Sequence, residues 1–367
     1  MTQAYQMNHL KFLTTVLILT LSSIGSILIS TQKVAAQVVI TLNGSVEWKP
    51  QGGRFNQVFQ NMTLRQGSLL RLRQGANVTI ACPDGYLRTW TTYGTSGLSQ
   101  ICPPPRLRSG RVITPRSGIQ DIPYAILPRA TTILSSQPIL RWNSITDANN
   151  FTLIVRGQGL NWTERVERVD VCTGQICEFT FPGESQLEID TAYRLVIEAD
   201  NGRSSAEETT GGLGFKLLNT PEATEVNQII ERIEAQDLSL VSKALTLANL
   251  YQSYNLISDA IQTLERVSQE EKAVEIYRQL GGLYHQIGLP LEAEFHYLRA
   301  IMLAKADNNI NILELSAAQF GLGEVNYALG RNNDAVRLFH DAKRGYARLG
   351  DIQQVDQIEA RLEILNP

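Results

Sequence analysis

Four cysteines are the residues whose spacing most directly limits the chemistry of this 367-residue chain. Their even number, in an oxidising compartment, favours two disulfides, and four cysteines allow three pairings. We prefer Cys82 with Cys102 and Cys172 with Cys177, because each pair then falls within one module. Zinc is the alternative, but neither spacing is C-x2-C and no histidine lies nearby. We therefore expect two disulfides and no metal site.

Histidine offers little for catalysis. His9 lies in the N-terminal segment, and His285, His296 and His340 are scattered over the last third of the chain. No H-E-x-x-H, G-x-S-x-G or phosphate-loop motif accompanies them. We predict a protein that is not an enzyme, with no catalytic residue and no cofactor.

Arginine dominates the charge of the first part of the mature chain. Residues 38–130 hold eleven Lys and Arg against three Asp and Glu, and ten of the eleven are arginine. Arginine forms planar, two-pronged contacts with carboxylate, phosphate or sulfate. The predicted anion-contacting residues are Arg65, Arg71, Arg73, Arg88, Arg106, Arg108, Arg111 and Arg116. They would bind an anionic envelope polymer, a lipid headgroup or an acidic protein.

The rest of the chain is acidic. Residues 131–218 hold seven basic against twelve acidic side chains, and residues 219–367 hold thirteen against twenty-one. The arginines could therefore form a solvated face that balances the acidic modules of the same chain. Docking of the basic on the acidic modules, within one molecule or by self-association, stays open.

The first 36 residues have the pattern of a targeting segment. Lys11 precedes an apolar stretch from Phe12 to Ile29, and Val34-Ala35-Ala36 supplies small residues for cleavage. The stretch also approaches bilayer-spanning length, so an uncleaved N-terminal anchor is the alternative. Either way the body of the protein is expected to be exported, to the periplasm or cell envelope, and export disfavours nucleic acid as a partner.

Residues 37–130 are expected to form a small all-β domain. Apolar residues alternate with period two, as in Val78, Ile80 and Cys82, and glycine-rich turns separate the runs. Gly44-Ser45-Val46, Leu64 to Leu70 and the run Gly75 to Gly85 resemble the FecR-like domain of bacterial envelope proteins. That resemblance implies a role in envelope regulation. The cysteine-flanked segment and Pro103-Pro104-Pro105 depart from the family pattern.

Residues 131–218 are expected to form a second all-β domain, a sandwich. Short alternating strands are separated by turn signals such as Asn201-Gly202. The spacing from Leu187 to Tyr193, followed by alternation to Ala199, resembles a fibronectin type III or immunoglobulin-like domain. The resemblance implies that Tyr193 hydrogen-bonds back to the preceding loop and that Trp142 fills the core.

Residues 219–367 are predicted to be all-α. Residues 274–307 and 316–349, and more weakly 241–273, resemble the 34-residue tetratricopeptide repeat, and residues 351–365 are expected to form a capping helix. The matching structural positions are Tyr277, Leu280, Gly281, Tyr284, Ala293, Tyr297, Ala300, Leu322, Gly323, Ala335, Phe339 and Ala342. An insertion around Lys305 to Ile312 should lengthen two facing helices.

The resemblance to tetratricopeptide proteins implies binding of a protein partner. In that family the first helix of each repeat lines a groove. The corresponding residues here are Asn249, Gln252, Arg278, His285, Gln286, Phe320, Glu324 and Tyr327. A ligand clamp for an acidic C-terminus would need lysine where Leu245 stands, so that type of recognition is not expected.

Three functions follow from these features. The first is a non-catalytic adaptor of the bacterial envelope that holds a protein partner through its helices. The second is a membrane-anchored sensor, which requires a retained N-terminal span. The third, an enzyme acting on envelope polysaccharide, would need a deep acid-lined pocket.

Overall fold

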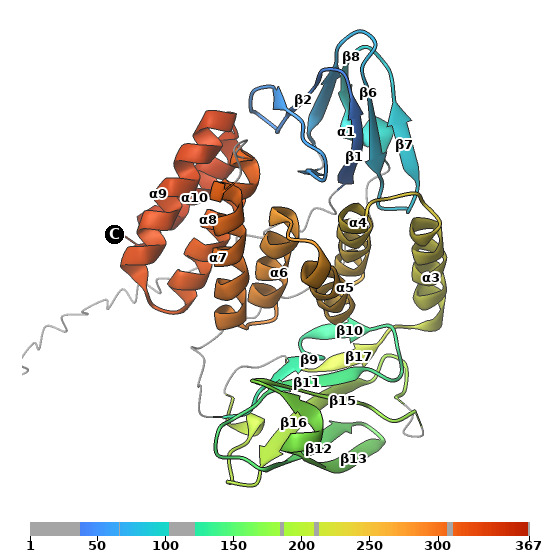
Figure 1. Ribbon diagram of the computed structural model, residues 1–367, viewed down its shortest axis with the longest axis vertical. Coiled ribbons are helices and arrows are strands. Elements are labelled where there is room, and N and C mark those ends of the chain that lie inside the picture. The colour runs from blue at the N-terminus through green and yellow to red at the C-terminus, as the bar shows by residue number, and fades with distance from the viewer. Residues whose placement is uncertain are drawn as a thin grey trace, which may run out of the picture. The chain divides into compact units, whose positions relative to one another are not determined.

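The computed structural model describes residues 37–65, 67–102, 122–183, 187–208, 213–306 and 311–365. The targeting segment and Arg106, Arg108, Arg111 and Arg116 lie outside these residues. Residues 33–367 form one compact unit. Within it, two β regions are followed by a helical region (Figure 1). The predicted order of β modules before helices is therefore confirmed.

The first β region consists of two four-stranded sheets around one apolar core. The strand orders are β4-β1-β6-β7 and β3-β2-β5-β8. The strands are β1 (Gln37–Asn43), β2 (Val46–Lys49), β3 (Asn56–Gln57), β4 (Thr63–Leu64), β5 (Leu69–Leu72), β6 (Asn77–Ala81), β7 (Leu87–Trp90) and β8 (Gly94–Gly97), followed by a short helix α1 (Leu98–Ile101). Alternation explains the pairing of the sheets, because Leu70 and Leu72 of one and Val78 and Ile80 of the other are fully buried in the same cluster.

A disulfide closes this region as predicted. Cys82 follows β6, Cys102 follows α1, and the two are bridged across a separation of 20 residues. Both cysteines belong to the buried core. The bridge therefore ties the end of one sheet to the helix that follows the other sheet.

The second β region pairs a five-stranded sheet, β10-β17-β16-β12-β13, with a four-stranded sheet, β14-β15-β11-β9. Its strands are β9 (Ala125–Leu127), β10 (Thr131–Ile133), β11 (Ile139–Asn143), β12 (Asn150–Gly157), β13 (Leu160–Glu167), β14 (Cys172–Thr173), β15 (Ile176–Thr180), β16 (Ala192–Ala199) and β17 (Phe215–Leu217), with short helices α2 (Arg168–Val171) and η1 (Ser205–Glu207). Strand β9 pairs with β11, so residues 125–127 belong to this region and not to the first module. The predicted boundary at residue 130 therefore does not coincide with the strand pairing.

Tyr193 and Trp142 have the predicted structural roles. The Tyr193 hydroxyl accepts a hydrogen bond from the Glu188 amide, 2.8 Å away, in the preceding loop. Trp142 is fully buried and meets Phe151 edge to face. Cys172 and Cys177 are bridged, and they face each other across a hairpin whose turn consists of the two residues Gly174 and Gln175. Gly174 has a positive φ of 63°, which permits a two-residue turn.

Eight helices follow in the described part of residues 219–365: α3 (Thr220–Glu234), α4 (Leu240–Ser253), α5 (Ile257–Glu270), α6 (Val274–Gln286), α7 (Pro290–Ala306), α8 (Ile312–Ala328), α9 (Asn332–Leu349) and α10 (Ile352–Leu365). Helices α4, α6 and α8 contact one another directly, and α10 joins α8 through Arg361 and Glu324. We call α4, α6, α8 and α10 the inner layer. Helices α5, α7 and α9, which follow the first three, form the outer layer.

Glycine permits the layers to approach closely. A Cβ atom on Gly281 of α6 would lie 2.7 Å from the ring of Tyr297 on α7, and one on Gly321 of α8 would lie 2.2 Å from the same ring. Tyr297 therefore occupies the space between two successive inner helices. The two helices that flank the insertion, α7 and α8, have 17 residues each, against 13 in α6.

The first β region contacts the helices at two places. Near the start of the array, Ser242 of α4 donates to Asn61, and Arg232 of α3 donates to the Asp84 carbonyl. Near its end, Asn56 donates to the Leu349 carbonyl at 2.8 Å. Arg65 and Asp351 form an ion pair there at 3.7 Å. The region thus links residues at opposite ends of the array.

The second β region contacts loops between helices. The Asn255 carbonyl, between α4 and α5, accepts hydrogen bonds from the Thr132 amide and the Thr131 hydroxyl. Arg129 donates to the Ile287 carbonyl between α6 and α7, and it also forms a two-pronged pair with Glu208. Arg129 is 2% exposed, so this guanidinium is buried where the β region meets the array.

Among the helices that the structure describes, none combines the length and the apolar character that a bilayer span requires.

Replacing Glu208 with Gln should destabilise the protein by about 3–5 kcal/mol, because the buried Arg129 guanidinium would lose its counter-charge. Urea unfolding followed by tryptophan fluorescence measures this change. The matched control is Glu207→Gln. Glu207 pairs with Arg203, and both side chains are exposed, so the loss of this ion pair should have little effect. Equal stability of the two variants would contradict the role assigned to Arg129.

Candidate protein-binding site

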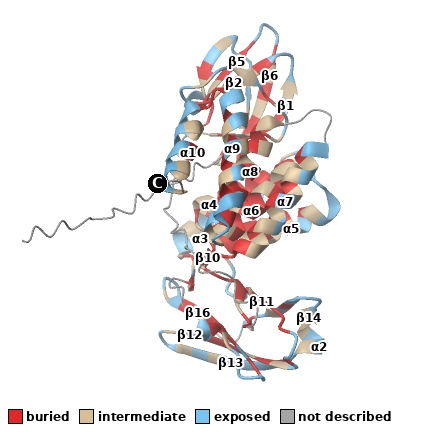
Figure 2. Ribbon diagram, turned by 90° about the vertical axis from the view of Figure 1, so that its left-hand side faces the viewer, coloured by how far each residue is buried: buried red, intermediate tan, exposed pale blue. Residues whose placement is uncertain are grey.

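The predicted groove residues lie on the inner layer, and most of them are engaged within the chain. All residues of α6 are described, and each is buried or half-buried; in α8 only Tyr327 is exposed (Figure 2). The inner helices are joined by polar pairs that repeat along the array. These pairs are Asn249 with Gln279 from α4 to α6, Arg278 with Glu314 from α6 to α8, and Glu324 with Arg361 from α8 to α10.

The remaining predicted groove residues show the same closure. Gln252 donates weakly, at 3.4 Å, to the carbonyl of Ala248 in its own helix, and Gln286 is buried. Phe320 packs against Phe339, with ring centroids 5.7 Å apart. Of the eight, Tyr327 alone presents a large exposed surface. The inner layer is therefore a packed polar interface, and its residues are not brought together as an open groove.

Burial sets the charge of this interface. It lowers the pKa of His285 to about 4, with a further contribution from Arg361, so His285 is neutral at pH 7. Burial raises the pKa of Glu324, against which the Arg361 guanidinium acts. His296 on α7 stacks on Tyr284, and burial lowers its pKa to about 4 as well. Burial thus keeps both imidazoles neutral in the folded array, and Glu324 is paired with Arg361.

The predicted anion-contacting arginines that the structure describes are all paired with carboxylates. Arg71 and Arg73 contact Glu47, at 2.8 and 3.7 Å. Arg88 contacts Asp84 at 2.6 Å, and Arg65 contacts Asp351 in the helical region. Glu47 and Asp84 belong to the same β region, and they supply two negative charges against its five described arginines.

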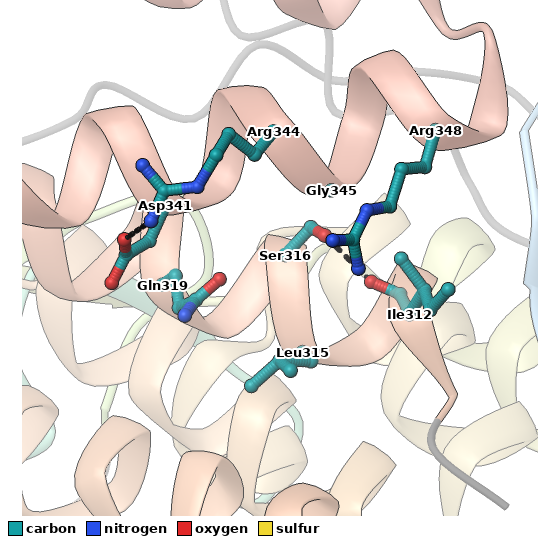
Figure 3. A pocket seen from close by; sticks show the side chains of 8 residues that line it. All are labelled: Ile312, Leu315, Ser316, Gln319, Asp341, Arg344, Gly345 and Arg348. Carbon is teal, nitrogen blue, oxygen red and sulfur yellow. Dashed lines mark hydrogen bonds and ion pairs between the residues drawn. The ribbon is translucent and has the colours of Figure 1, made fainter.

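Two adjoining cavities open instead between the outer helices α7 and α9, over α8. The first, of about 360 Å³, lies between α8 and α9 (Figure 3). The second, of about 410 Å³, lies between α7, α8 and α9. They share Gln319 and Asp341, so we treat them as one feature, the outer groove. Its floor is the stripe of α8 formed by Ile312, Leu315, Gln319, Leu322 and Asn326.

The floor of the outer groove spans about 21 Å, at 1.5 Å per residue along α8. Gly345 of α9 lets the two helices approach, because a Cβ atom there would meet the Ser316 hydroxyl of α8 at 1.9 Å. Ser316 itself donates to the Ile312 carbonyl, so it leaves no donor aimed outward. The groove is thus shaped by α8 and α9 at one end and by α7 and α9 at the other.

An exposed apolar stripe borders the outer groove. Phe295, Leu298 and Met302 of α7 are 63%, 51% and 49% exposed. Their spacing of three and then four residues places them on one face of the helix. Leu298 lines the groove, together with the half-buried Ile301. The opposite face of α7 carries the buried Ala293, Tyr297, Ala300 and Ala304, so α7 is apolar on both sides.

The groove walls carry five basic and three acidic side chains. Arg331 pairs with Glu294 at 2.5 Å, Arg337 with Asp334 at 2.9 Å, and Arg344 with Asp341. The other two basic residues are Lys305 and Arg348. Among the described residues no carboxylate lies within ion-pair distance of either.

The sequence contained a signal for this groove that the repeat alignment obscured. The alignment assigns function to the first helix of each repeat, whereas the exposed apolar residues are on the second helix, α7. Ordinary amphipathic packing predicts polar residues at Phe295, Leu298 and Met302, because one apolar face already serves the core. Their departure from that pattern is readable without a structure.

The described side chains offer no metal centre. Within the parts of the chain that the structure describes, no group of three or more His, Cys, Asp or Glu residues is arranged to hold a metal ion.

No protein-family model matches this chain, and no curated protein matches it. Among solved structures, the crystal structure of BtubC (BKLC) from P. vanneervenii is similar to part of it. The two are 15% identical, with a TM-score of 0.27, and the similarity covers 40% of this chain and 72% of BtubC. A likeness at that TM-score supports no inference about fold or function.

Acid should destabilise the array through His285 and His296. Their folded-state pKa of about 4 lies below the ordinary 6.5, so the unfolded chain takes up protons first as the pH falls. The stabilisation is present above pH 6.5 and is lost towards pH 4, at roughly 3 kcal/mol for each histidine. We expect the free energy of unfolding, measured with urea between pH 7 and pH 4, to fall less in the double variant His285→Gln/His296→Gln than in the wild type.

The control for this measurement is His340→Gln, because His340 is exposed on α9. It should follow the wild type. Parallel loss of stability in the wild type and the double variant would show that other groups cause the acid sensitivity.

Proposed function

We propose that this protein is an exported, non-catalytic scaffold of the tetratricopeptide type, which binds a protein partner in the outer groove. The proposal keeps the function that the repeat resemblance implies, and it moves the binding surface from the inner layer to the face shared by α7, α8 and α9. The observation that carries it is the exposed stripe of Phe295, Leu298 and Met302 beside a groove of helix length.

The energetics of burial support this surface. Complete burial of a large apolar side chain contributes about 1.5–3 kcal/mol. Because each residue of the stripe is about half exposed, roughly half of this free energy becomes available only when a partner covers it. Apolar residues gathered along a groove and rimmed by charges are typical of protein-binding sites. Helices α6 and α8 of the inner layer offer no comparable apolar stripe, since their polar side chains bond to neighbouring inner helices and Tyr327 is their one exposed residue.

Two features support export. The cysteines form two disulfides, Cys82–Cys102 and Cys172–Cys177, which persist in oxidising compartments such as the periplasm. The N-terminal residues have the sequence pattern of a targeting segment.

We infer that the first β region mainly braces the array. Its contacts with Ser242 and Arg232 at one end, and with Leu349 and Asp351 at the other, connect helices that are distant along the array. Pairing of the four predicted anion-contacting arginines that are described, Arg65, Arg71, Arg73 and Arg88, with carboxylates supports this role over capture of an anionic envelope polymer. The second β region, through Arg129 and Thr131, holds the opposite ends of the helix pairs.

Photo-crosslinking in the native host tests the scaffold. A photoreactive phenylalanine analogue at Leu298 should crosslink a defined protein, which mass spectrometry identifies, whereas the same analogue at the exposed Val169 of the second β region should not. The identified protein is then purified and titrated against the full chain. Leu298→Asp should weaken its binding at least about tenfold, from the loss of apolar burial.

The matched control for the titration is Ile364→Asp on α10, because Ile364 is 50% exposed and lies outside the groove. It should bind as the wild type does. If Leu298 and Val169 give the same crosslinks, or if Leu298→Asp binds normally, the groove is not the binding surface.

A further inference from the structure

The outer groove has a charge that differs from the helical region around it. Residues 219–367 carry thirteen basic and twenty-one acidic side chains, a balance of −8. The groove lining carries five basic and three acidic side chains, a balance of +2. A basic groove on an acidic domain selects by charge which partner can approach it.

The excess charge is concentrated at one end of the groove. Lys305 lies in the last turn of α7, and Arg348 lies in the last turn of α9. The acidic residues of the groove lie elsewhere and are already paired, with Arg331, Arg337 and Arg344. Arg344 and Arg348 extend from neighbouring turns of α9 above the α8 floor (Figure 3). An occupant therefore meets apolar surface along the groove and, where α7 and α9 end, two positive charges that no described carboxylate pairs with.

We propose that the occupant is an amphipathic helix of another protein, with acidic residues at the end that lies beside Lys305 and Arg348. The inference rests on the proposed function and specifies the chemistry of the partner. The floor of about 21 Å accommodates about 14 residues of helix. Apolar side chains at helical spacing would cover Leu298, Ile301 and Leu322, which line the groove.

The described helices of this chain do not supply the occupant. The acidic amphipathic helices among them are α3, α5 and α10, and their apolar faces are packed against the core, that of α5 through Ile261, Leu264 and Val267. Val226, Ile229 and Ile233 of α3 lie in one core, and Ile358 of α10 lies in another. The segment 103–121 holds four arginines and one acidic residue, and its charge opposes binding to a basic groove. A second protein is thus the occupant that fits both the apolar surface and the charge.

Each of the two cations also stabilises the carboxyl end of its own helix, through the helix dipole. That role requires only the position in the last turn. It does not explain why both side chains line the same groove. It also does not explain why neither has an ion-pair partner among the described residues. Binding must therefore be measured at equal concentrations of folded protein.

Two synthetic peptides test the proposal against the full chain. Both have about 15 residues, with leucine at helical spacing matched to the groove. One carries three glutamates in its last two turns, and the other carries lysine at the same positions. Fluorescence anisotropy at low ionic strength should show the acidic peptide binding about tenfold more tightly, from two ion pairs beside an apolar surface. Added salt should narrow the difference.

Charge reversal supplies the matched comparison. Lys305→Glu/Arg348→Glu should reverse the preference between the peptides. The control Lys272→Glu/Arg266→Glu makes the same change in net charge at exposed positions outside the groove, and it should preserve the preference. Circular dichroism fixes the folded fraction of every variant.

The outcomes separate this inference from the proposed function. Equal binding of both peptides, abolished by Leu298→Asp, overturns the charge selectivity and leaves the groove as a binding surface. Selective binding that Leu298→Asp does not affect overturns the placement in the groove. Light scattering that shows a dimer, lost in Leu298→Asp, makes a second copy the occupant and overturns the inference. Failure of Leu298→Asp to alter binding of the crosslinked protein counts against the proposed function alone.

Discussion

The buried guanidinium of Arg129 is the constraint on which the placement of the second β region depends. A charge removed from water must be compensated, and Arg129 finds Glu208 and the Ala125 carbonyl in its own region and the Ile287 carbonyl between α6 and α7. Those partners come from three segments far apart in the sequence. They can satisfy one side chain only when the β region is docked on the ends of the helix pairs. Arg141 joins the same two parts of the chain, because it donates to Glu178 in the second β region and to Glu265 on α5.

Docking at the ends of the helix pairs determines which helical surfaces remain open. The first β region contacts α3, α4 and the turn between α9 and α10, and the second contacts the loops after α4 and α6. The inner layer closes on itself through polar pairs between successive helices. The outer face of α7 and α9 is among the surfaces that remain exposed, and α7 carries three large apolar side chains there. The proposed placement of the binding surface on the outer layer therefore rests on how the same chain uses its other faces, as much as on the groove itself.

The sequence predicted the parts that depend on local pattern. Period-two alternation located the β regions, and the repeat resemblance named Gly281 and Tyr297 as structural positions, although not the contact of Tyr297 with Gly321. The cysteine pairs followed from their position within modules. Contacts between distant segments had no such pattern: the bond from Ser242 to Asn61 joins residues that no spacing relates. Strand β9 precedes the predicted boundary at residue 130, whereas its hydrogen bonds are made with β11, and the local pattern of residues 125–127 does not identify that partner strand. The closure of the inner layer was also unreadable, since Arg278 and Glu324 are the residue types expected on an open face.

The composition of α7 is hard to explain by folding alone. Ala293, Tyr297, Ala300 and Ala304 already provide the contacts that hold α7 to α6 and α8, so its outward positions were free to be polar. The outward positions of α9 are polar, as at His340 and Arg344. Phe295, Leu298 and Met302 instead expose apolar surface, which lowers solubility without adding to the core. Such residues on α7 lie beside a groove, and Lys305 at the end of α7 and Arg348 at the end of α9 have no ion-pair partner among the described residues. This composition supports the proposed role in association. The geometry of the array positions this surface, and the charge at its end restricts what can occupy it.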